Sequence, residues 1–192
     1  HGVDHVMNVY YNAIHLAKIE NADLEVVKAG VLLHDIGRKE EHEAKGKVSH
    51  AIIGAAKAQK ILQNLGCDAK FIEKVRLCVL RHSNRHNEEN PETLEEKIVY
   101  DADKLDAIGA VGIGRVFMVA GKIGARIHNP VPDLSDGAAY GSEDTAFREY
   151  EMKLKHIRDK MYTNEGKRLA KRRHEFMEKF FDELNDEISG NR

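Results

Sequence analysis

The chain has few cysteines and no long apolar run. Its two cysteines, Cys67 and Cys78, are too few among 192 residues for a disulfide framework. We expect both to be reduced, in a cytoplasmic protein. No apolar stretch approaches the ~20 residues that a membrane-spanning helix needs, and no secretory signal opens the sequence. These absences argue against a disulfide-stabilised secreted protein and against a membrane partner.

The chain also lacks an excess of charge of either sign. Thirty Lys and Arg side chains stand against 32 Asp and Glu, which gives a formal charge of −2. That balance does not suggest a dedicated nucleic-acid binder. The length fits one domain, so we expect a single domain over residues 1–192. Because the chain begins at His1 rather than at methionine, we expect an excerpt or a processed product.

No segment shows the alternation of a strand, and the apolar residues instead recur at three- and four-residue steps. Asp23, Ser49, Asp68 and Thr93 stand where helix caps are expected. The sequence therefore predicts an all-α fold. We expect helices over about 6–17, 23–34, 49–66, 68–82, 93–105, 109–124, 147–161 and 169–188, with loops at 38–47, 83–92 and 127–142.

A histidine followed directly by an aspartate, His34-Asp35, ends the second apolar helix. Adjacent helical residues point about 100° apart, so the pair can share a cation only off the helix edge. His5 and Asp103 lie on two other expected helices and are further candidate ligands. Two imidazoles and two carboxylates suit manganese, iron, cobalt, nickel or zinc better than calcium, and they leave positions for water and substrate.

The stretch Asp101–Ile113 reads Asp-Ala-Asp-Lys-Leu-Asp-Ala-Ile-Gly-Ala-Val-Gly-Ile. Together with His34-Asp35 it resembles the small bacterial and archaeal HD-domain metal-dependent phosphohydrolases. The resemblance implies a helical bundle with a metal site between helices. The motif-bearing part would span about 1–126, and C-terminal helices over 143–189 would pack on it. The implied metal ligands are His5, His34, Asp35 and, among the three aspartates of the stretch, Asp103.

The resemblance also implies hydrolysis of phosphate esters or anhydrides, often in nucleotides. A divalent ion activates water and polarises a phosphoryl oxygen. We expect manganese first, then iron, cobalt, nickel or zinc, with magnesium entering alongside the substrate. Asp35 and Lys104 are the candidate catalytic residues, and in the family histidines placed like His50 and His82 contact phosphate or a second metal. The candidate substrate-binding residues are Arg38, Lys39, His50, His82, His86 and Arg115.

Three functions remain open. The first is hydrolysis of a small nucleotide, with a nucleoside triphosphate or another phosphoanhydride as the expected substrate. The second is a phosphodiesterase acting on RNA or a cyclic nucleotide, favoured if the basic run 167–173 lines the approach to the metal. The third is a non-catalytic metal-dependent nucleotide-binding module. The oligomeric state is left open, a homodimer included.

Two weaker patterns in the sequence do not indicate a function. The glycines of Gly109-x-x-Gly112-x-Gly114 follow a helix and lack a Gly-Lys-Ser/Thr ending, so we interpret them as close helix packing rather than a phosphate loop. The remaining histidines are interpreted as solvated or loop residues: His15, His42, His128, His156 and His174.

Overall fold

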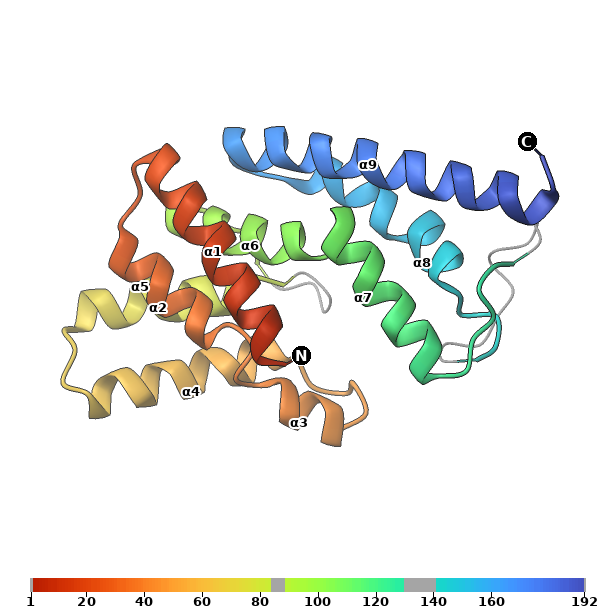
Figure 1. Ribbon diagram of the computed structural model, residues 1–192. Coiled ribbons are helices and arrows are strands. Elements are labelled where there is room, and N and C mark those ends of the chain that lie inside the picture. Colours follow the sequence, from red (N-terminus) through yellow and green to blue (C-terminus); the bar gives the residue numbers. More distant parts are fainter. Residues whose placement is uncertain (1, 84–88, 130–140, 192) are drawn as a thin grey trace. The chain divides into compact units, whose positions relative to one another are not determined.

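The computed structural model describes residues 2–83, 89–129 and 141–191 (Figure 1). Within these ranges all regular secondary structure is helical, which confirms the predicted all-α class. No helix among the described residues is long and apolar enough to cross a membrane. The helices are α1 (Val3–Glu20), α2 (Leu24–Leu33), α3 (Arg38–Glu43), α4 (His50–Asn64), α5 (Ala69–Arg81), α6 (Leu94–Asp106), α7 (Gly109–Lys122), α8 (Ala146–Met152), the 3-10 helix η1 (Leu154–Lys160) and α9 (Asn164–Ser189).

The helix starts follow the expected caps. The Asp23 carboxylate accepts the first backbone N–H groups of α2, and the Asp68 carboxylate does the same for α5. The Ser49 hydroxyl accepts the Ile52 N–H at the start of α4. Each cap satisfies donors that have no partner within the helix, which fixes where α2, α4 and α5 begin.

Two helical expectations were wrong in detail. Residues 38–43, expected as loop, form α3, because the Arg38–Glu41 pair at 3.0 Å supports a helical turn that apolar periodicity does not reveal. The single helix expected over 147–161 is α8 followed by η1. Much of the loops expected at 83–92 and 127–142 lies outside the described residues.

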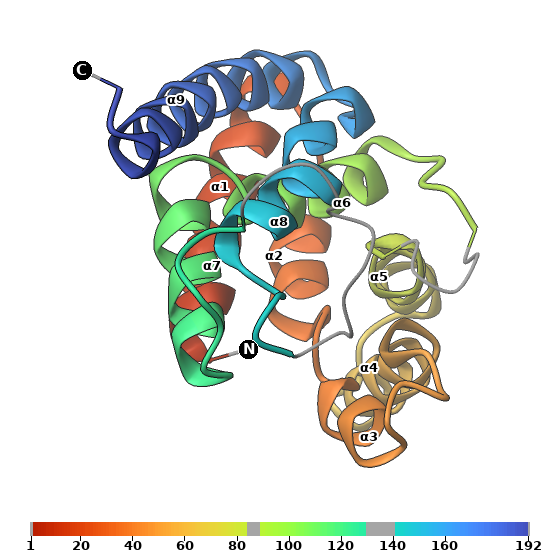
Figure 2. The same ribbon diagram turned by 90° about the vertical axis from the view of Figure 1, so that its right-hand side faces the viewer.

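The chain divides into two compact units, and the single-domain organisation over 1–192 stays a prediction. The first unit comprises the residues up to Asp103 together with Tyr162–Gly166. Within it α1 packs on α2, α2 on α5, α5 on α4, and α4 on α3 (Figures 1 and 2). Its core contains fully buried side chains, among them Val9, Leu16, Val27, Val31, Ala51, Val75 and Val79.

The second unit comprises Lys104–Met161 and α9 from Lys167 onward, with α7 packed on α8 and α8 on η1. A Cβ atom on Gly112 would lie 2.3 Å from the carbonyl oxygen of Ala107, in the turn just before α7, and one on Gly109 would lie 3.0 Å from the Arg173 side chain of α9. A Cβ atom on Gly114 would meet nothing within 4 Å, so close helix packing fits Gly109 but not Gly114. The expectation that His174 is solvated was wrong. Its side chain is buried on α9, with Nε2 lying 2.9 Å from the Glu178 carboxylate.

Candidate metal centre

The four side chains expected to bind metal converge within the first unit. His5 Nε2 lies 3.3 Å from His34 Nε2, 3.6 Å from Asp35 Oδ2 and 3.4 Å from Asp103 Oδ1. His34 Nε2 lies 3.7 Å and 4.0 Å from the same two carboxylate oxygens. His5 lies on α1, His34 and Asp35 directly follow the end of α2, and Asp103 lies on α6. Residues distant in sequence thus surround one point.

A second group of ligand atoms meets the other oxygen of Asp35. Asp35 Oδ1 lies 3.6 Å from His50 Nε2 and 3.7 Å from His82 Nε2. The two histidine nitrogens lie 3.1 Å apart. His50 opens α4 and His82 follows α5, and both are fully buried. Asp35 therefore presents one carboxylate oxygen to each of two groups of ligand atoms.

Hydrogen bonds on the far side of three rings orient the imidazoles. The Nδ1 atoms of His34 and His82 donate to the carbonyl oxygens of Val31 and Val79, each at 2.6 Å. His50 Nδ1 donates to Glu41 Oε1 at 2.8 Å. With Nδ1 carrying the proton in each ring, Nε2 presents a lone pair toward Asp35.

The electrostatics favour the neutral form of His34 and His50 and the ionised form of Asp35. Burial lowers the pKa of His34, and burial together with the Arg38 cation lowers the pKa of His50 to about 4. Burial opposes ionisation of Asp35, but its polar and charged neighbours, the Arg38 cation among them, outweigh it and hold its pKa well below the ordinary range. At neutral pH these groups therefore present lone pairs and negative charge, as a cation requires.

Arg38 and Glu41 form the polar support of His50 and Asp35. Arg38 Nε donates to Asp35 Oδ1 at 2.6 Å, and Nη1 donates to Glu41 Oε2 at 3.0 Å. The other Glu41 oxygen accepts the His50 proton. Glu41 is not among the expected site residues, because it lies in a segment expected to be loop. The only available signal was its three-residue spacing from Arg38.

Gly37 permits the close approach of the α2–α3 turn to α4. A Cβ atom at this position would lie 2.2 Å from the carbonyl oxygen of His50 and 2.8 Å from the backbone nitrogen of Gly54. Any other residue would push the turn away from α4. A glycine directly after His34-Asp35-Ile36 therefore lets His50 lie close to Asp35.

The three aspartates around Lys104 have different surroundings. Asp101 is fully buried and accepts hydrogen bonds from the backbone N–H groups of Tyr162 and Thr163 and from the Thr163 hydroxyl. Asp103 faces His5, whereas Asp106 pairs with Arg115 in the second unit. The partners of Asp101 lie more than sixty residues away, so nothing near it in sequence revealed this role.

The other candidate substrate residues are placed differently. Lys39 has an 81% exposed side chain and lies 3.9 Å from Glu43. Lys104 and Arg115 belong to the second unit. His86 lies outside the described residues. Arg38, His50 and His82 contact Asp35 directly.

Helices that bring a His-Asp pair together with an upstream histidine and a downstream aspartate define a class of helical hydrolases. The family model "HD domain" matches residues 2–108, more than half of the chain. The chain belongs to the HD-domain family, whose members bind divalent metal ions.

The relatives include proteins that match over nearly the whole chain. Bacillus subtilis YpgQ is 31% identical over 194 residues, covering 99% of this chain and 85% of YpgQ. Its crystal structure superposes with a TM-score of 0.76 at 29% identity, covering 98% of this chain and 89% of that one. An HD-superfamily hydrolase from Bacillus thuringiensis gives 0.75 at 27% identity, covering 97% and 85%. A further crystal structure shows YpgQ in complex with ADP, with a TM-score of 0.75 at 30% identity, covering 97% and 86%.

A more local similarity connects the chain to a protein named as a ribonuclease. Ribonuclease Y of Chloroflexus aurantiacus is 31% identical over 103 residues. The match covers 54% of this chain but only 18% of the ribonuclease. The likeness is therefore confined to the part of the chain that carries the HD motifs.

Proposed function

We propose that this chain is a divalent-metal-dependent phosphohydrolase acting on nucleotides, with nucleoside triphosphates as the first substrate class. One observation carries the proposal. Both oxygens of Asp35 face groups of histidine nitrogens, one group with His5 and His34 and the other with His50 and His82. Such a concentration of buried metal-coordinating atoms without a cation costs folding free energy, because the lone pairs and the negative charge repel one another.

The spacing of these atoms fits metal binding. Nitrogen and oxygen ligands bind first-row divalent ions at about 2.0–2.2 Å, so two neighbouring ligands of one ion lie about 3.0–3.6 Å apart. The separations around His5 are 3.3–3.6 Å, and those around His50 are 3.1–3.6 Å. Three other separations are wider: His34 lies 3.7 Å from Asp35 and 4.0 Å from Asp103, and His82 lies 3.7 Å from Asp35. His5, His34, Asp35 and Asp103 would hold the first ion. Manganese is our first choice among the ions that prefer this mixed shell.

The second group, at His50 and His82, supports a second ion better than a direct contact to phosphate. A phosphate oxygen needs a hydrogen-bond donor, yet the Nε2 atoms of both rings carry lone pairs. Burial and the Arg38 cation also disfavour a second proton on His50, whose pKa is lowered to about 4. The Nε2 lone pairs of His50 and His82 would instead hold a divalent cation, which would supply positive charge for the phosphate.

The chain's own residues would then bind and orient the substrate. A bound divalent ion lowers the pKa of its water ligand and polarises a phosphoryl oxygen. Asp35 would orient the attacking water through the carboxylate that both groups share. Arg38, fixed by Asp35 and Glu41, presents a guanidinium at the edge of the site and would stabilise negative charge on the phosphate. Lys104, which follows Asp103 on α6, is the second proposed cation.

The YpgQ complex with ADP supports the nucleotide class, because that relative aligns over nearly the whole chain. The test has two parts. Metal analysis of the purified protein should give one or two divalent ions per chain, two if the His50 group also binds one. A panel of nucleoside triphosphates is then assayed separately for phosphate and pyrophosphate. Pyrophosphate release indicates cleavage between the α and β phosphorus atoms.

Variants connect activity to the centre. His34→Ala should lose both metal and turnover, whereas His42→Ala, at an exposed histidine of α3, should keep both. Lys104→Ala should raise KM and retain metal. Full turnover by metal-stripped His34→Ala would refute the mechanism.

A phosphodiesterase acting on RNA is the second candidate, supported by the similarity to ribonuclease Y over the HD motifs. Metal-dependent cleavage of a single-stranded RNA, with all nucleoside triphosphates left intact, would favour it. The relevant binding should weaken steeply as salt is added, because phosphate contacts release counterions.

A further inference from the structure

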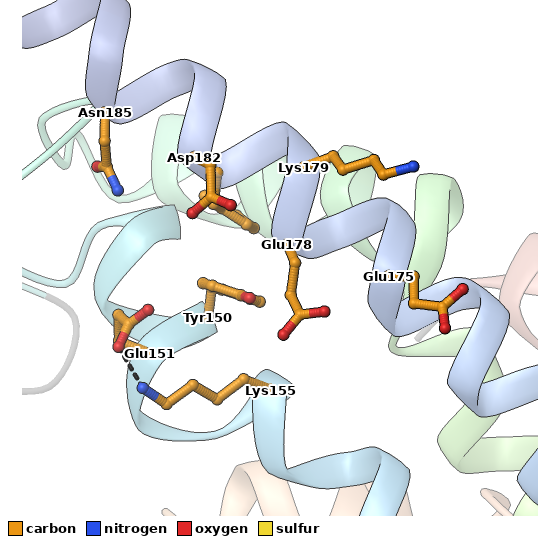
Figure 3. A pocket seen from close by; sticks show the side chains of 9 residues that line it. Tyr150, Glu151, Lys155, Glu175, Glu178, Lys179, Asp182 and Asn185 are labelled. Carbon is orange, nitrogen blue, oxygen red and sulfur yellow. Dashed lines mark hydrogen bonds and ion pairs between the residues drawn. The ribbon is translucent and has the colours of Figure 1, made fainter.

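The part of α9 that belongs to the second unit carries a row of exposed cations. Four of them come from the basic run 167–173 and occupy positions i, i+1, i+4 and i+5, which a helix places side by side: Lys167, Arg168, Lys171 and Arg172. Lys179 lies about two turns further along the same side, and Figure 3 shows its side chain extending away from Tyr150 of α8. These five cations, together with Phe176, form the basic face. None of them belongs to the metal centre.

Three of the five cations have no acidic partner within the part of the chain that the structure describes. Lys167, Arg172 and Lys179 form no ion pair there, and Lys171 lies 3.9 Å from Glu175. The preceding helices of the second unit differ, because their cations pair with an acid four positions earlier: Arg148 with Asp144, Lys153 with Glu149 and Lys155 with Glu151. The charge of the basic face is therefore available to an external anion.

This charge pattern costs helix stability. Like charges four positions apart repel one another, and the basic face contains two such pairs, Lys167 with Lys171 and Arg168 with Arg172. Lys167 also lies in the first turn of α9, near the positive end of the helix dipole. Bound anions would relieve both effects. The pattern therefore indicates binding of a series of negative charges rather than stabilisation of the helix.

Phe176 adds a different kind of contact to the basic face. It lies four positions after Arg172 and therefore one turn further on the same side of α9. Phe176 is 51% exposed, whereas the other five phenylalanines are buried or half-buried. An aromatic ring exposed beside cations can stack on a nucleobase while the cations bind the neighbouring phosphates. The ring thus favours a partner that combines negative charge with flat aromatic groups.

We propose that the basic face binds single-stranded nucleic acid. From Lys167 to Lys179 it spans about 18 Å of the helix axis, which is room for about five stacked nucleotides at ~3.4 Å each. A duplex fits less well, because its bases stack on one another and leave no free face for Phe176. A membrane surface also fits less well, since an amphipathic helix needs an apolar side toward the lipid, and the apolar side of α9 is buried.

Fluorescence anisotropy tests the proposal with a labelled oligouridine of about 12 nucleotides, titrated with the Mn²⁺-loaded full chain at about 0.1 M salt. We expect saturable binding, with the logarithm of the affinity falling linearly with the logarithm of the salt concentration. His34→Ala should bind the RNA equally well, because the basic face lies outside the metal centre. That variant also keeps the measurement valid if the metal centre cleaves RNA, and it separates this proposal from the proposed hydrolysis.

Two variants separate the phosphate contacts from the stacking contact. Lys167→Gln/Arg172→Gln should weaken binding at least tenfold and reduce the salt slope by about 1.4, since each phosphate contact to a single strand contributes about 0.7. Phe176→Leu should weaken binding at least fivefold and leave the slope unchanged, because stacking releases no counterions. The matched control Lys70→Gln/Lys74→Gln makes the same charge change at exposed positions of α5 and should stay within twofold of the parent. Thermal melting of each variant verifies folding.

Three results would overturn the proposal. One is the absence of saturable binding at about 0.1 M salt. Another is an equal loss in the Lys70/Lys74 control, which would mean attraction to the net charge of the chain. The third is an unchanged affinity in Phe176→Leu together with equally tight binding of an RNA duplex or of anionic phospholipid vesicles. The basic face would then attract any polyanionic surface and would not select a single strand.

Discussion

The Nε2 atoms of His5 and His34 lie 3.3 Å apart, although 29 positions separate the two residues in the sequence. Both side chains are buried. His34 cannot turn its proton toward His5, because its Nδ1 atom donates to the Val31 carbonyl. The close approach is compatible with a cation that both nitrogens would bind, and the Asp35 and Asp103 carboxylates lie beside it.

Metal binding is accordingly expected to stabilise the fold. An ion present at about one hundred times its Kd contributes about 2.7 kcal/mol. For a chain of this size that corresponds to a rise in Tm of about 5–10 °C. Differential scanning fluorimetry of the metal-free protein with and without added Mn²⁺ measures this rise in Tm. The rise should vanish in His34→Ala and persist in His42→Ala. An equal rise in His34→Ala would show that Mn²⁺ acts elsewhere.

Asp101 and Asp103 should differ in what their loss changes. Asp103→Asn should lower metal content while leaving the stability of the stripped protein nearly unchanged, because Asp103 faces His5. Asp101→Ala leaves three donors without an acceptor, two of them buried, and should cost about 3 kcal/mol or more in unfolding free energy. Metal content should stay normal in its folded fraction. Urea unfolding and elemental analysis of both variants distinguish the roles, and loss of metal in Asp101→Ala alone would reverse them.

The sequence predicted the helices with periodic apolar faces and capping residues, because these depend on local chemistry. It also predicted which residues meet around Asp35, since the His-Asp pair and the Asp-x-Asp stretch form a specific combination. It did not predict Glu41, whose importance depends on the fold of α4 against the turn at Gly37. Local sequence also could not show that Asp101 accepts backbone hydrogen bonds whereas Asp103 faces His5. The Thr163 N–H that Asp101 binds lies far away in the sequence and is brought close only by the tertiary structure.

Stability of the metal-free protein should fall in mild acid. Burial and the Arg38 cation lower the folded-state pKa of His50 to about 4, against about 6.5 in an unfolded chain. Between these values the unfolded chain binds a proton that the folded chain does not, so stability declines as the pH falls from about 6.5 to about 4. His50 alone should contribute about 3 kcal/mol of this loss. The lowered pKa of Asp35 contributes only below this range.

Urea unfolding at pH 7, 5.5 and 4.5 measures that decline. His50→Gln should flatten the curve, because glutamine does not titrate, and His42→Gln should leave it unchanged. A decline of the same size in His50→Gln would assign the effect to other groups.

Glu41 is expected to act as a positioning residue for both His50 and Arg38. Glu41→Gln keeps an acceptor for the His50 proton but loses the charge that orients Arg38, so kcat should fall about tenfold, equivalent to about 1.4 kcal/mol. Glu41→Ala removes both contacts and should lower kcat further, with KM rising as Arg38 loses its orientation. Steady-state kinetics with a nucleoside triphosphate and Mn²⁺ measure both constants. Glu43→Gln, an exposed carboxylate two positions along α3, is the matched control and should leave both unchanged. If Glu41→Ala retains the parent kcat, His50 and Arg38 are held by the remaining fold and Glu41 has no role in the reaction.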